Sequence, residues 1–514
     1  MSTPIPDALL DEIEFLLRSG QLAVFCGAGI SRSPPSNLPL ASELTAFMFE
    51  RLLGPKDCAS FKAKFEKLPL ELLIEIIARN ADTFLPVFAQ LLHSATPNRN
   101  HLFLARLIAN GYLQAVMTTN FDLLIERALT QQDHVNFEVY SREEQFENLD
   151  SKDLLQPSVV KLHGTADDLQ SIRSTLRDIA TVKKSAARKD VLNLFFGKLQ
   201  KDVLVLGYSA RDEFDINPAI RSMATETRIY HVVHTSNLIP ETHALGGVFA
   251  NFRGLQVSCN TQQLLTTLRS RLFREEDVTE PDGVDTWRKF LHDQWFTQID
   301  ERTKLVIASE IMETIGELAK AREYLLEHFS RSKSEDVRML LNLGRIEQEM
   351  HLSEAKGHLD TCLNAAGTQH DDFLKARSLQ LLGQVAHDSS EFISAKVLAQ
   401  QSQELFQRIR DEATIGLSAI LHQLGMTYLS LELPRAKAEK LFQQSIELSR
   451  ELGDLVGEAR SLVQLGLTYK QQNRRADAIR VIDHARSIYI RLAMSDKAAL
   501  MEAELALLRG VLGK

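Results

Sequence analysis

The sequence predicts an α/β protein: a doubly wound parallel sheet with a helical insert, followed by an all-α solenoid of helical hairpins. Two observations lead to this fold class. Short apolar runs alternate with helical patterns in the first half of the chain, which is typical of a parallel sheet covered by helices on both faces. The second half is helical throughout and repeats with a period near 40 residues, which is typical of a solenoid.

The predicted strands lie at six places in the first half of the chain. They are residues 22–25, 115–118, 159–162, 203–206, 229–233 and 255–258. Helical patterns cover residues 7–18, 121–130 and 190–200. Between the first two strands, residues 41–110 show helical patterns broken by prolines and no strand, which predicts a helical insert. We therefore expect a sheet domain over residues 1–275, a linker that begins in the acidic stretch 274–285 and is helical over 276–335, and repeats over 336–514.

The repeats are marked by Leu-Gly pairs whose glycines stand about 40 residues apart. These pairs are residues 343–344, 382–383, 424–425 and 465–466. Small residues at this spacing are expected where the two helices of a hairpin cross. The repeats resemble tetratricopeptide repeats of the longer variety, although the tryptophan of the full consensus is absent, and a non-repetitive helical bundle is the alternative. A solenoid surface implies a protein trigger or partner, and assembly into a homo-oligomer is also expected.

Composition and length indicate a soluble protein of two or three domains, because 514 residues are many for one core. The formal net charge of −9 disfavours a nucleic-acid partner. The N-terminus has no basic start followed by an apolar stretch, and no apolar run approaches the length of a membrane span. We therefore expect a cytoplasmic protein with no membrane partner.

The four cysteines predict no metal site. They are Cys26, Cys58, Cys259 and Cys362. No two of them form a Cys-x-x-Cys pair, so neither a zinc ribbon nor a redox dithiol is predicted. Cys26 and Cys259 lie in apolar runs and are expected in the core. His101, at the start of a helical pattern, is expected to pack at the helix end rather than to act in catalysis.

The first predicted strand runs into a glycine turn, Gly27-Ala28-Gly29-Ile30-Ser31. A turn of this kind after a strand lets backbone N–H groups approach a pyrophosphate. The third glycine of the dinucleotide fingerprint is absent, and a tight turn without a ligand is the alternative. Ser31 is expected to cap the following helix, to donate to a phosphate, or to do both.

Polar side chains and glycines follow three further strands at their carboxyl ends. They are Thr119, Asn120 and Asp122 after residues 115–118, His163 after 159–162, and Gly207 and Ser209 after 203–206. Parallel strands gather ligand and catalytic groups at this edge of a sheet. Asn120 can hold a ribose hydroxyl or a water, Asp122 can orient the amide, and His163 can act as a general base. The alternatives are helix capping by Asn120 and Asp122 and a structural role for His163.

Together, these four segments resemble the sirtuin superfamily over residues 10–275. The glycine turn is similar to the family's signature turn, Thr118-Thr119-Asn120-Phe121-Asp122 to its Thr-Gln-Asn-Ile-Asp, Leu162-His163-Gly164 to its catalytic histidine segment, and Gly207-Tyr208-Ser209 to its Gly-Thr-Ser. The resemblance implies a Rossmann-like fold in which Asn120 and His163 act at the nicotinamide ribose of NAD⁺. The implied NAD⁺-binding residues are Gly27, Ala28, Gly29, Ser31, Thr119, Gly207 and Ser209.

Two departures from the protein-deacylating sirtuins narrow this expectation. The two Cys-x-x-Cys pairs that hold structural zinc are absent, and residues 37–42 replace the segment whose Phe and Arg help guard the nicotinamide pocket. In both respects the chain resembles the prokaryotic sirtuin-like domains of antiphage defence, which hydrolyse NAD⁺. The resemblance thus implies an NAD⁺ glycohydrolase that uses NAD⁺ as substrate, needs no zinc and protects cells by depleting NAD⁺. An NAD⁺-dependent deacylase, an ADP-ribosyltransferase and a non-catalytic NAD⁺ sensor are the alternatives.

Overall fold

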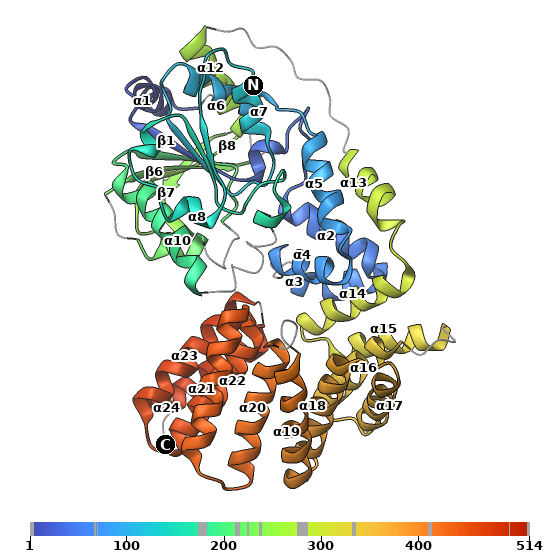
Figure 1. The fold of residues 1–514 in the computed structure, drawn as a ribbon. Coiled ribbons are helices and arrows are strands. Elements are labelled where there is room, and N and C mark those ends of the chain that lie inside the picture. Colours follow the sequence, from blue (N-terminus) through green and yellow to red (C-terminus); the bar gives the residue numbers. More distant parts are fainter. Residues whose placement is uncertain are drawn as a thin grey trace. The chain divides into compact units, whose positions relative to one another are not determined.

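The chain folds into two compact units, seen in a computed structural model (Figure 1). The structure describes residues 5–65, 68, 70–172, 182–210, 216–223, 226–235, 239–274, 286–331, 336–409, 414–492 and 494–510. The first unit comprises Met1–Arg51, Ala81–Ile179 and Lys183–Ile299. The second comprises Leu52–Asn80, Ala180–Val182 and Asp300–Lys514. Most of the stretch 274–285, where the linker is predicted to begin, lies outside the described residues.

The first unit is built on an eight-stranded sheet in the part of the chain that the structure describes. Its strands are β1 (Leu22–Cys26), β2 (Ala115–Thr118), β3 (Glu138–Tyr140), β4 (Ser158–Lys161), β5 (Asp202–Leu206), β6 (Arg228–His234), β7 (Glu241–Ala244) and β8 (Arg253–Cys259). Their order is β3-β4-β2-β1-β5-β6-β8-β7, and β7 alone among them runs antiparallel to its neighbour. Because β2 and β5 lie on opposite sides of β1, the sheet is doubly wound, and the predicted fold class is confirmed.

The six predicted strands are all present, but β3 and β7 were missed. β3 has three residues, and all four residues of β7 are exposed. Neither segment carries a run of buried apolar residues, which is the signal by which strands of a parallel sheet are recognised in a sequence. Both lie at the edges of the sheet, where one side of the strand has no neighbour.

Helices cover both faces of the sheet, because its central strands are apolar on both sides and must be buried on both. Leu22, Val24 and Cys26 face one core, and Ala23 and Phe25 face the other, because successive side chains of a strand point in opposite directions. The first core is closed by α1 (Asp7–Arg18), α6 (Arg99–Ala109), α7 (Leu124–Thr130) and α12 (Thr261–Phe273). The second is closed by α8 (Glu143–Phe146), α10 (Val182–Asn193) and α11 (Ile216–Arg221).

The predicted insert 41–110 is helical, but its helices divide between the two units. α2 (Ala41–Leu52), α5 (Phe84–Ser94) and α6 belong to the first unit apart from the last residue of α2, and α3 (Pro55–Phe65) and α4 (Leu70–Asn80) to the second. Within the second unit, Lys64 Nζ pairs with Glu317 at 2.7 Å and Arg79 with Glu310 at 2.8 Å. The pair α3–α4 is therefore part of the helical unit, although its sequence lies between two strands of the sheet.

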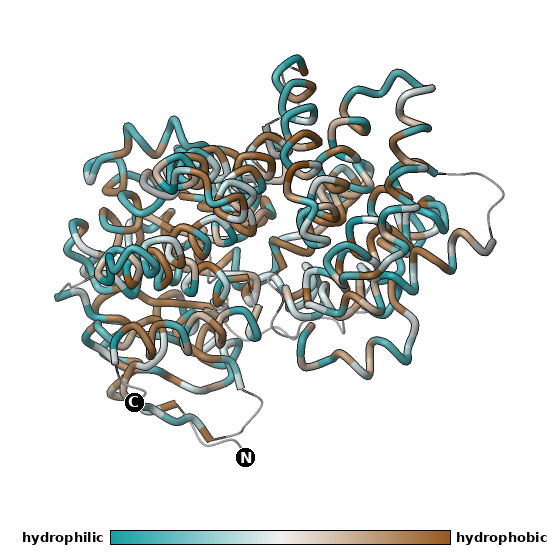
Figure 2. The backbone as a smooth tube through the Cα atoms, turned by 90° about the horizontal axis from the view of Figure 1, so that it is seen from below, coloured by the Kyte–Doolittle hydropathy of each residue, from teal (hydrophilic) through white to brown (hydrophobic). Residues whose placement is uncertain are grey.

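The second unit continues with helical hairpins to the end of the described chain. Its helices are α14 (Glu301–Thr314), α15 (Leu318–Arg331), α16 (Val337–Glu349), α17 (Glu354–Thr368), α18 (Asp372–Asp388), α19 (Phe392–Arg408), α20 (Thr414–Ser430), α21 (Arg435–Leu452), α22 (Leu455–Gln471), α23 (Arg475–Arg491) and α24 (Ser495–Arg509). Hydrophobic and hydrophilic residues alternate along the helical parts of the chain (Figure 2). Among the described helices, none combines the length and apolar character that a membrane span requires.

The glycines of the Leu-Gly pairs lie where the two helices of a hairpin meet, as predicted. A Cβ atom on Gly344 would lie 2.6 Å from Leu359 Cγ, and one on Gly466 would lie 2.5 Å from Ile482 Cγ1. These distances are shorter than van der Waals contact, so a larger residue would push the helices of the hairpin apart. The sequence repeat thus reflects a repeated packing contact.

Candidate functional site

The four motif segments meet at the carboxyl edge of the sheet. Cys26, the last residue of β1, pairs with Thr118 of β2 and with Leu206 of β5. Thr118 in turn pairs with Lys161, the last residue of β4. The residues that follow these four strands therefore leave the sheet side by side, at the edge where doubly wound folds place their ligand sites.

The glycine turn packs against the loop after β5, backbone against backbone. Gly27 N–H donates to Leu206 O at 3.0 Å, and Gly29 N–H donates to Gly207 O at 2.9 Å. A Cβ on Gly29 would lie 2.6 Å from Gly207 Cα, and Gly207 has a φ of +63°. The prediction that N–H groups of this turn approach a pyrophosphate is therefore wrong for Gly27 and Gly29, whose N–H groups already bind carbonyl oxygens. Both glycines are required by the close approach of the two loops.

Ser31, Asp122 and Asn120 form one buried hydrogen-bond network. Ser31 Oγ donates to Asp122 Oδ2 at 2.8 Å, and Asn120 Nδ2 donates to Ser31 Oγ and to Asp122 Oδ2, both at 3.2 Å. Asp122 Oδ1 also accepts the N–H of Leu124 at the start of α7, so this residue serves both as the expected partner of the amide and as a helix cap. Ser31 Oγ donates its proton to Asp122 and accepts from the side chains of Asn120 and His101, so its oxygen does not cap a helix.

The network determines which way the Asn120 amide faces. With Nδ2 turned toward the Asp122 carboxylate the amide donates, whereas the opposite orientation would place two acceptors against each other. Asn120 Oδ1 is buried and has no hydrogen-bond partner among the described residues. An acceptor that is buried in this way is costly unless a ligand donates to it. Asn120 Oδ1 is therefore suited to accept from a substrate hydroxyl or a water.

His101 joins the same network, a contact that the sequence did not indicate. Its Nδ1 accepts the backbone N–H of Asn98 at 3.2 Å in the capping box of α6, as the expected role at the helix end requires. A neutral ring with Nδ1 as acceptor carries its proton on Nε2, which lies 3.1 Å from Ser31 Oγ and donates to it. Burial lowers the pKa of His101 from 6.5 to about 4, so the ring is neutral at pH 7.

Lowering the pH is expected to destabilise the protein through His101. Between pH 6.5 and 4 the unfolded chain binds a proton at this ring and the folded chain does not, so the free energy of unfolding falls as the pH falls. From pH 7.5 to 5.0, His101→Gln should reduce the loss of stability by about 2 kcal/mol, measured by denaturant unfolding. His243→Gln, at an exposed position on β7, is the control and should leave the loss unchanged. A His101 variant with the full pH dependence would contradict the assignment.

The loop that carries His163 is tied to the Asn120 loop at three points. Leu162 N–H donates to Thr118 O at 2.9 Å, and Ala166 N–H donates to Phe121 O at 2.8 Å. Lys161 Nζ, which is fully buried, donates to the backbone oxygen of Asp122 and to Glu126 Oε1, the latter at 2.8 Å. His163 itself is buried at 4% exposure, and its ring lies 6.0 Å from that of Phe121. Sequence reasoning missed Lys161 as a residue that joins the two loops.

The remaining predicted residues lie at the same edge but differ in exposure. Thr119 N–H donates to Cys26 O at 3.2 Å, which joins the ends of β1 and β2. Ala28 and Gly207 are partly buried, and Ser209 is exposed. Ala28, Thr119, Gly207 and Ser209 thus lie on the loops around the network without contributing a side chain to it.

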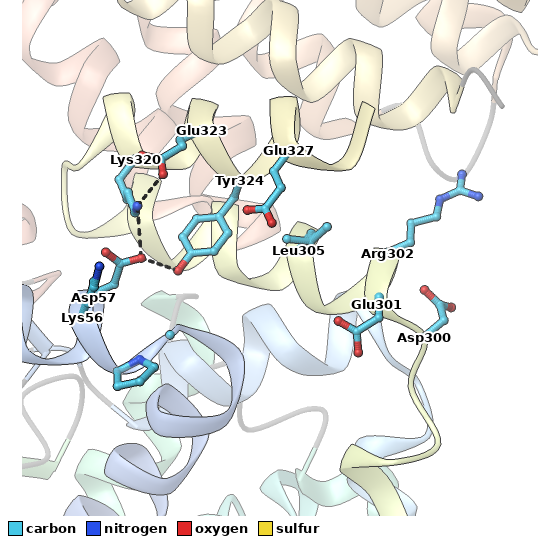
Figure 3. A pocket seen from close by; sticks show the side chains of 12 residues that line it. Lys56, Asp57, Asp300, Glu301, Arg302, Leu305, Lys320, Glu323, Tyr324 and Glu327 are labelled. Atoms are coloured by element: carbon cyan, nitrogen blue, oxygen red, sulfur yellow. Dashed lines mark hydrogen bonds and ion pairs between the residues drawn. The ribbon is translucent and has the colours of Figure 1, made fainter. Parts of the chain in front are cut away.

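A cavity of about 880 Å³ lies elsewhere, within the second unit (Figure 3). It is lined by residues of α3, α14 and α15 and the segments before them. Tyr324 OH donates to Asp57 Oδ2 at 2.6 Å, and Lys320 Nζ lies 3.3 Å from the same carboxylate and 2.8 Å from Glu323. None of the predicted site residues lines this cavity. Lys320 pairs with both Asp57 and Glu323, and we assign no ligand to the cavity.

The four cysteines are all free thiols. Cys26, Cys259 and Cys362 are buried free thiols, and Cys58 is partly buried. Burial raises the pKa of Cys26 to about 12 and that of Cys259 to about 11, which keeps both protonated as core residues. Among the described residues, no group of three or more His, Cys, Asp or Glu side chains could hold a metal ion.

Comparison with known proteins bears on both units. Residues 114–241 match the family model of the SIR2-like domain. The chain carries a SIR2-like domain. The match includes Asn120, Asp122, His163, Gly207 and Ser209 and leaves out the glycine turn. Because β1 pairs with both β2 and β5, the SIR2-like sheet also needs β1 and the turn that follows it.

The repeats are also recognised, since residues 416–491 match a tetratricopeptide repeat model. No curated protein matches the chain. Solved structures with some likeness include the Rap protein complexed with competence and sporulation factor, with 10% identity over 48% of this chain and 68% of that chain and a TM-score of 0.38. A STAND protein with a tetratricopeptide repeat sensor from Pyrococcus horikoshii has 10% identity over 100% of this chain and 87% of its own, with a TM-score of 0.35. Scores this low carry no argument about function.

Proposed function

We propose that the SIR2-like domain is an NAD⁺ glycohydrolase that cleaves NAD⁺ to nicotinamide and ADP-ribose. The observation that carries the proposal is the buried Oδ1 atom of Asn120, which has no hydrogen-bond partner among the described residues and is turned away from Asp122. An acceptor held in this way fits a ribose hydroxyl or a water. The His163 loop is hydrogen-bonded to the Asn120 loop, which supports His163 as the proposed base.

The proposed reaction needs few groups. The bond between ribose C1′ and nicotinamide breaks, and its electron pair moves to the ring nitrogen, which neutralises the pyridinium charge. A water oxygen forms the new bond to C1′, and the proton that it loses passes to a ring nitrogen of His163. Asn120 orients the water or a ribose hydroxyl, and the Asp122 carboxylate behind the amide contributes negative charge that favours the cationic transition state.

The remaining parts of the proposal concern the binding loops and the biological role. Gly27, Ala28, Gly29, Ser31, Thr119, Gly207 and Ser209 are proposed to surround NAD⁺ at the edge of the sheet, the glycines by shaping the loops. The pairing of a SIR2-like domain with tetratricopeptide repeats supports an antiphage effector in the cytoplasm. In this proposal the repeats sense a protein trigger or assemble a homo-oligomer, and depletion of NAD⁺ stops phage growth. The boundaries of the sheet domain, linker and repeats at 275 and 335 also remain proposals.

Product analysis tests the proposal. The full chain is incubated with NAD⁺ alone and with NAD⁺ plus an acetylated-lysine peptide, and the products are separated by chromatography. We expect nicotinamide and free ADP-ribose in equal amounts, at the same rate with and without the peptide. Products that appear only with the peptide, as O-acetyl-ADP-ribose or a modified peptide, would instead indicate a deacylase or a transferase. Binding of NAD⁺ without any loss of it would indicate a sensor.

A further inference from the structure

The first helices of the hairpins form a continuous layer in the second unit. This first-helix layer consists of α14, α16, α18, α20, α22 and α24. Within it α16 packs on α18, α18 on α20 and α20 on α22. In a solenoid of helical hairpins, helices that pack together across successive repeats lie on the inner side of the curve, which is the side that offers a binding surface.

Ion pairs on this layer show how strongly it curves. Arg345 of α16 pairs with Glu313 of α14, with Nη2 at 2.5 Å from Oε2. Arg460 of α22 pairs with Glu349 of α16 at 2.7 Å. The second pair joins helices that α18 and α20 separate in the sequence, so the side chains of four successive first helices face a shared space.

Arg377 of α18 lies in this space without a carboxylate partner. It stands at the same position of its repeat as Arg460, since each precedes the glycine of its Leu-Gly pair by six residues. Its Nη1 donates to Gln380 Oε1 at 2.5 Å, and no carboxylate lies within ion-pair distance of it in the described part of the chain. Burial, together with the positive charges of Arg345 and Arg460, lowers the pKa of Arg377 to about 10. The carboxylates of Asp454 and Glu313 oppose this pKa shift only in part. A partly buried cation with these neighbours is unfavourable unless an anion binds it.

We propose that Arg377 binds a carboxylate of an acidic peptide segment that lies along the first-helix layer. The guanidinium offers paired N–H donors that match the two oxygens of a carboxylate. The neighbouring Arg345 and Arg460 each have a glutamate at ion-pair distance, whereas among the described residues Arg377 has none. A multiply charged phosphate would be repelled by Glu313 and Glu349, which favours a carboxylate. The inference rests on the proposed function, because it specifies the chemistry of the protein partner proposed above for the repeats.

Peptide binding tests the inference without any measurement of NAD⁺ chemistry. The probes are two fluorescent pools of nine-residue peptides with blocked ends and neutral random positions, one with a central Glu and one with a central Gln. The full chain should bind the Glu pool about tenfold more tightly than the Gln pool, since a hydrogen bond to a charged group contributes about 1.5 kcal/mol or more. Arg377→Gln should abolish the preference, and Arg377→Lys should keep part of it. Lys375→Gln, on the same helix, is the control and should behave as the unaltered chain.

Three outcomes would overturn the inference. The unaltered chain could bind the two pools equally or not at all, the preference for Glu could survive in Arg377→Gln, or inorganic phosphate could displace the Glu pool at a lower concentration than acetate. Thermal unfolding checks that the variants are folded. Since Arg377→Gln removes a charge that has no partner, its melting temperature should equal or exceed that of the unaltered chain, and a large fall would assign Arg377 a structural role instead. NAD⁺ loss is scored separately, so failure here and failure of the proposed hydrolysis are distinguishable.

Discussion

Replacing Asn120 or His163 with alanine is expected to abolish NAD⁺ loss while the fold stays intact. Asn120→Ala removes the buried acceptor that holds the water or ribose hydroxyl, and His163→Ala removes the base. Loss of a general base lowers a rate by about a hundredfold to ten-thousandfold, so at least a hundredfold fall is expected in each variant. The rate is measured from nicotinamide release by the full chain, with the unaltered chain assayed under the same conditions.

Two matched variants remove a histidine and an asparagine side chain at positions outside the candidate site. His243→Ala lies on the exposed strand β7, and Asn251→Ala removes an exposed amide that bonds Arg221 O at 2.9 Å. Both are expected to keep the rate of the unaltered chain. Circular dichroism and thermal unfolding establish that all four variants are folded. Unchanged NAD⁺ turnover in both Asn120→Ala and His163→Ala would contradict the assignment of the site.

Replacing Lys161 with methionine is expected to lower the free energy of unfolding by about 3 kcal/mol or more. Lys161 Nζ is fully buried, and its partner Glu126 is 13% exposed. Methionine fills a similar space but leaves the Glu126 carboxylate buried without its cation and the backbone oxygen of Asp122 without its donor. Removing one partner of a buried ion pair costs far more than the pair itself contributes, because the remaining charge loses its compensation.

Denaturant unfolding measures this effect, and two further variants determine its cause. Lys64→Met breaks a more exposed pair with Glu317 and is expected to cost no more than about 1 kcal/mol. The double variant Lys161→Met with Glu126→Leu removes both charges and should recover most of the stability that the single variant loses. A Lys161→Met protein as stable as the unaltered chain would show that the ion pair does not hold the two loops together.

Much of the candidate site could be predicted from the sequence, because its residues follow strands. An apolar run predicts a buried strand, and parallel strands bring their carboxyl ends to one edge, so Asn120, Asp122 and His163 were expected near one another before any contact was known. The contact between Asp122 and the Asn120 amide was also expected, since the two residues are close in sequence. The roles of these residues in catalysis stay a prediction.

The partners that lie far apart in the sequence could not be predicted in this way. His101 contacts Ser31 across a separation of 70 residues, and no local pattern relates a helix-capping histidine to a glycine turn. Lys161 lies within the predicted strand 159–162, and no local pattern indicated that its buried amine joins two loops. Gly27 and Gly29 suggested a phosphate site, but their N–H groups bind the loop after β5.

The sequence by itself determined six of the eight strands in the described residues, the doubly wound sheet, the repeats and the edge where the polar residues gather. These features depend on the period of apolar residues and on turn residues, which are local properties of a chain. Only the tertiary structure decided that α3 and α4 belong to the helical unit, that Asn120 Oδ1 is left as a buried acceptor, and that Arg377 has no carboxylate at ion-pair distance among the described residues. Each of these depends on which distant side chains share a buried space, where a charge or a hydrogen-bonding atom is stable only if it has a partner.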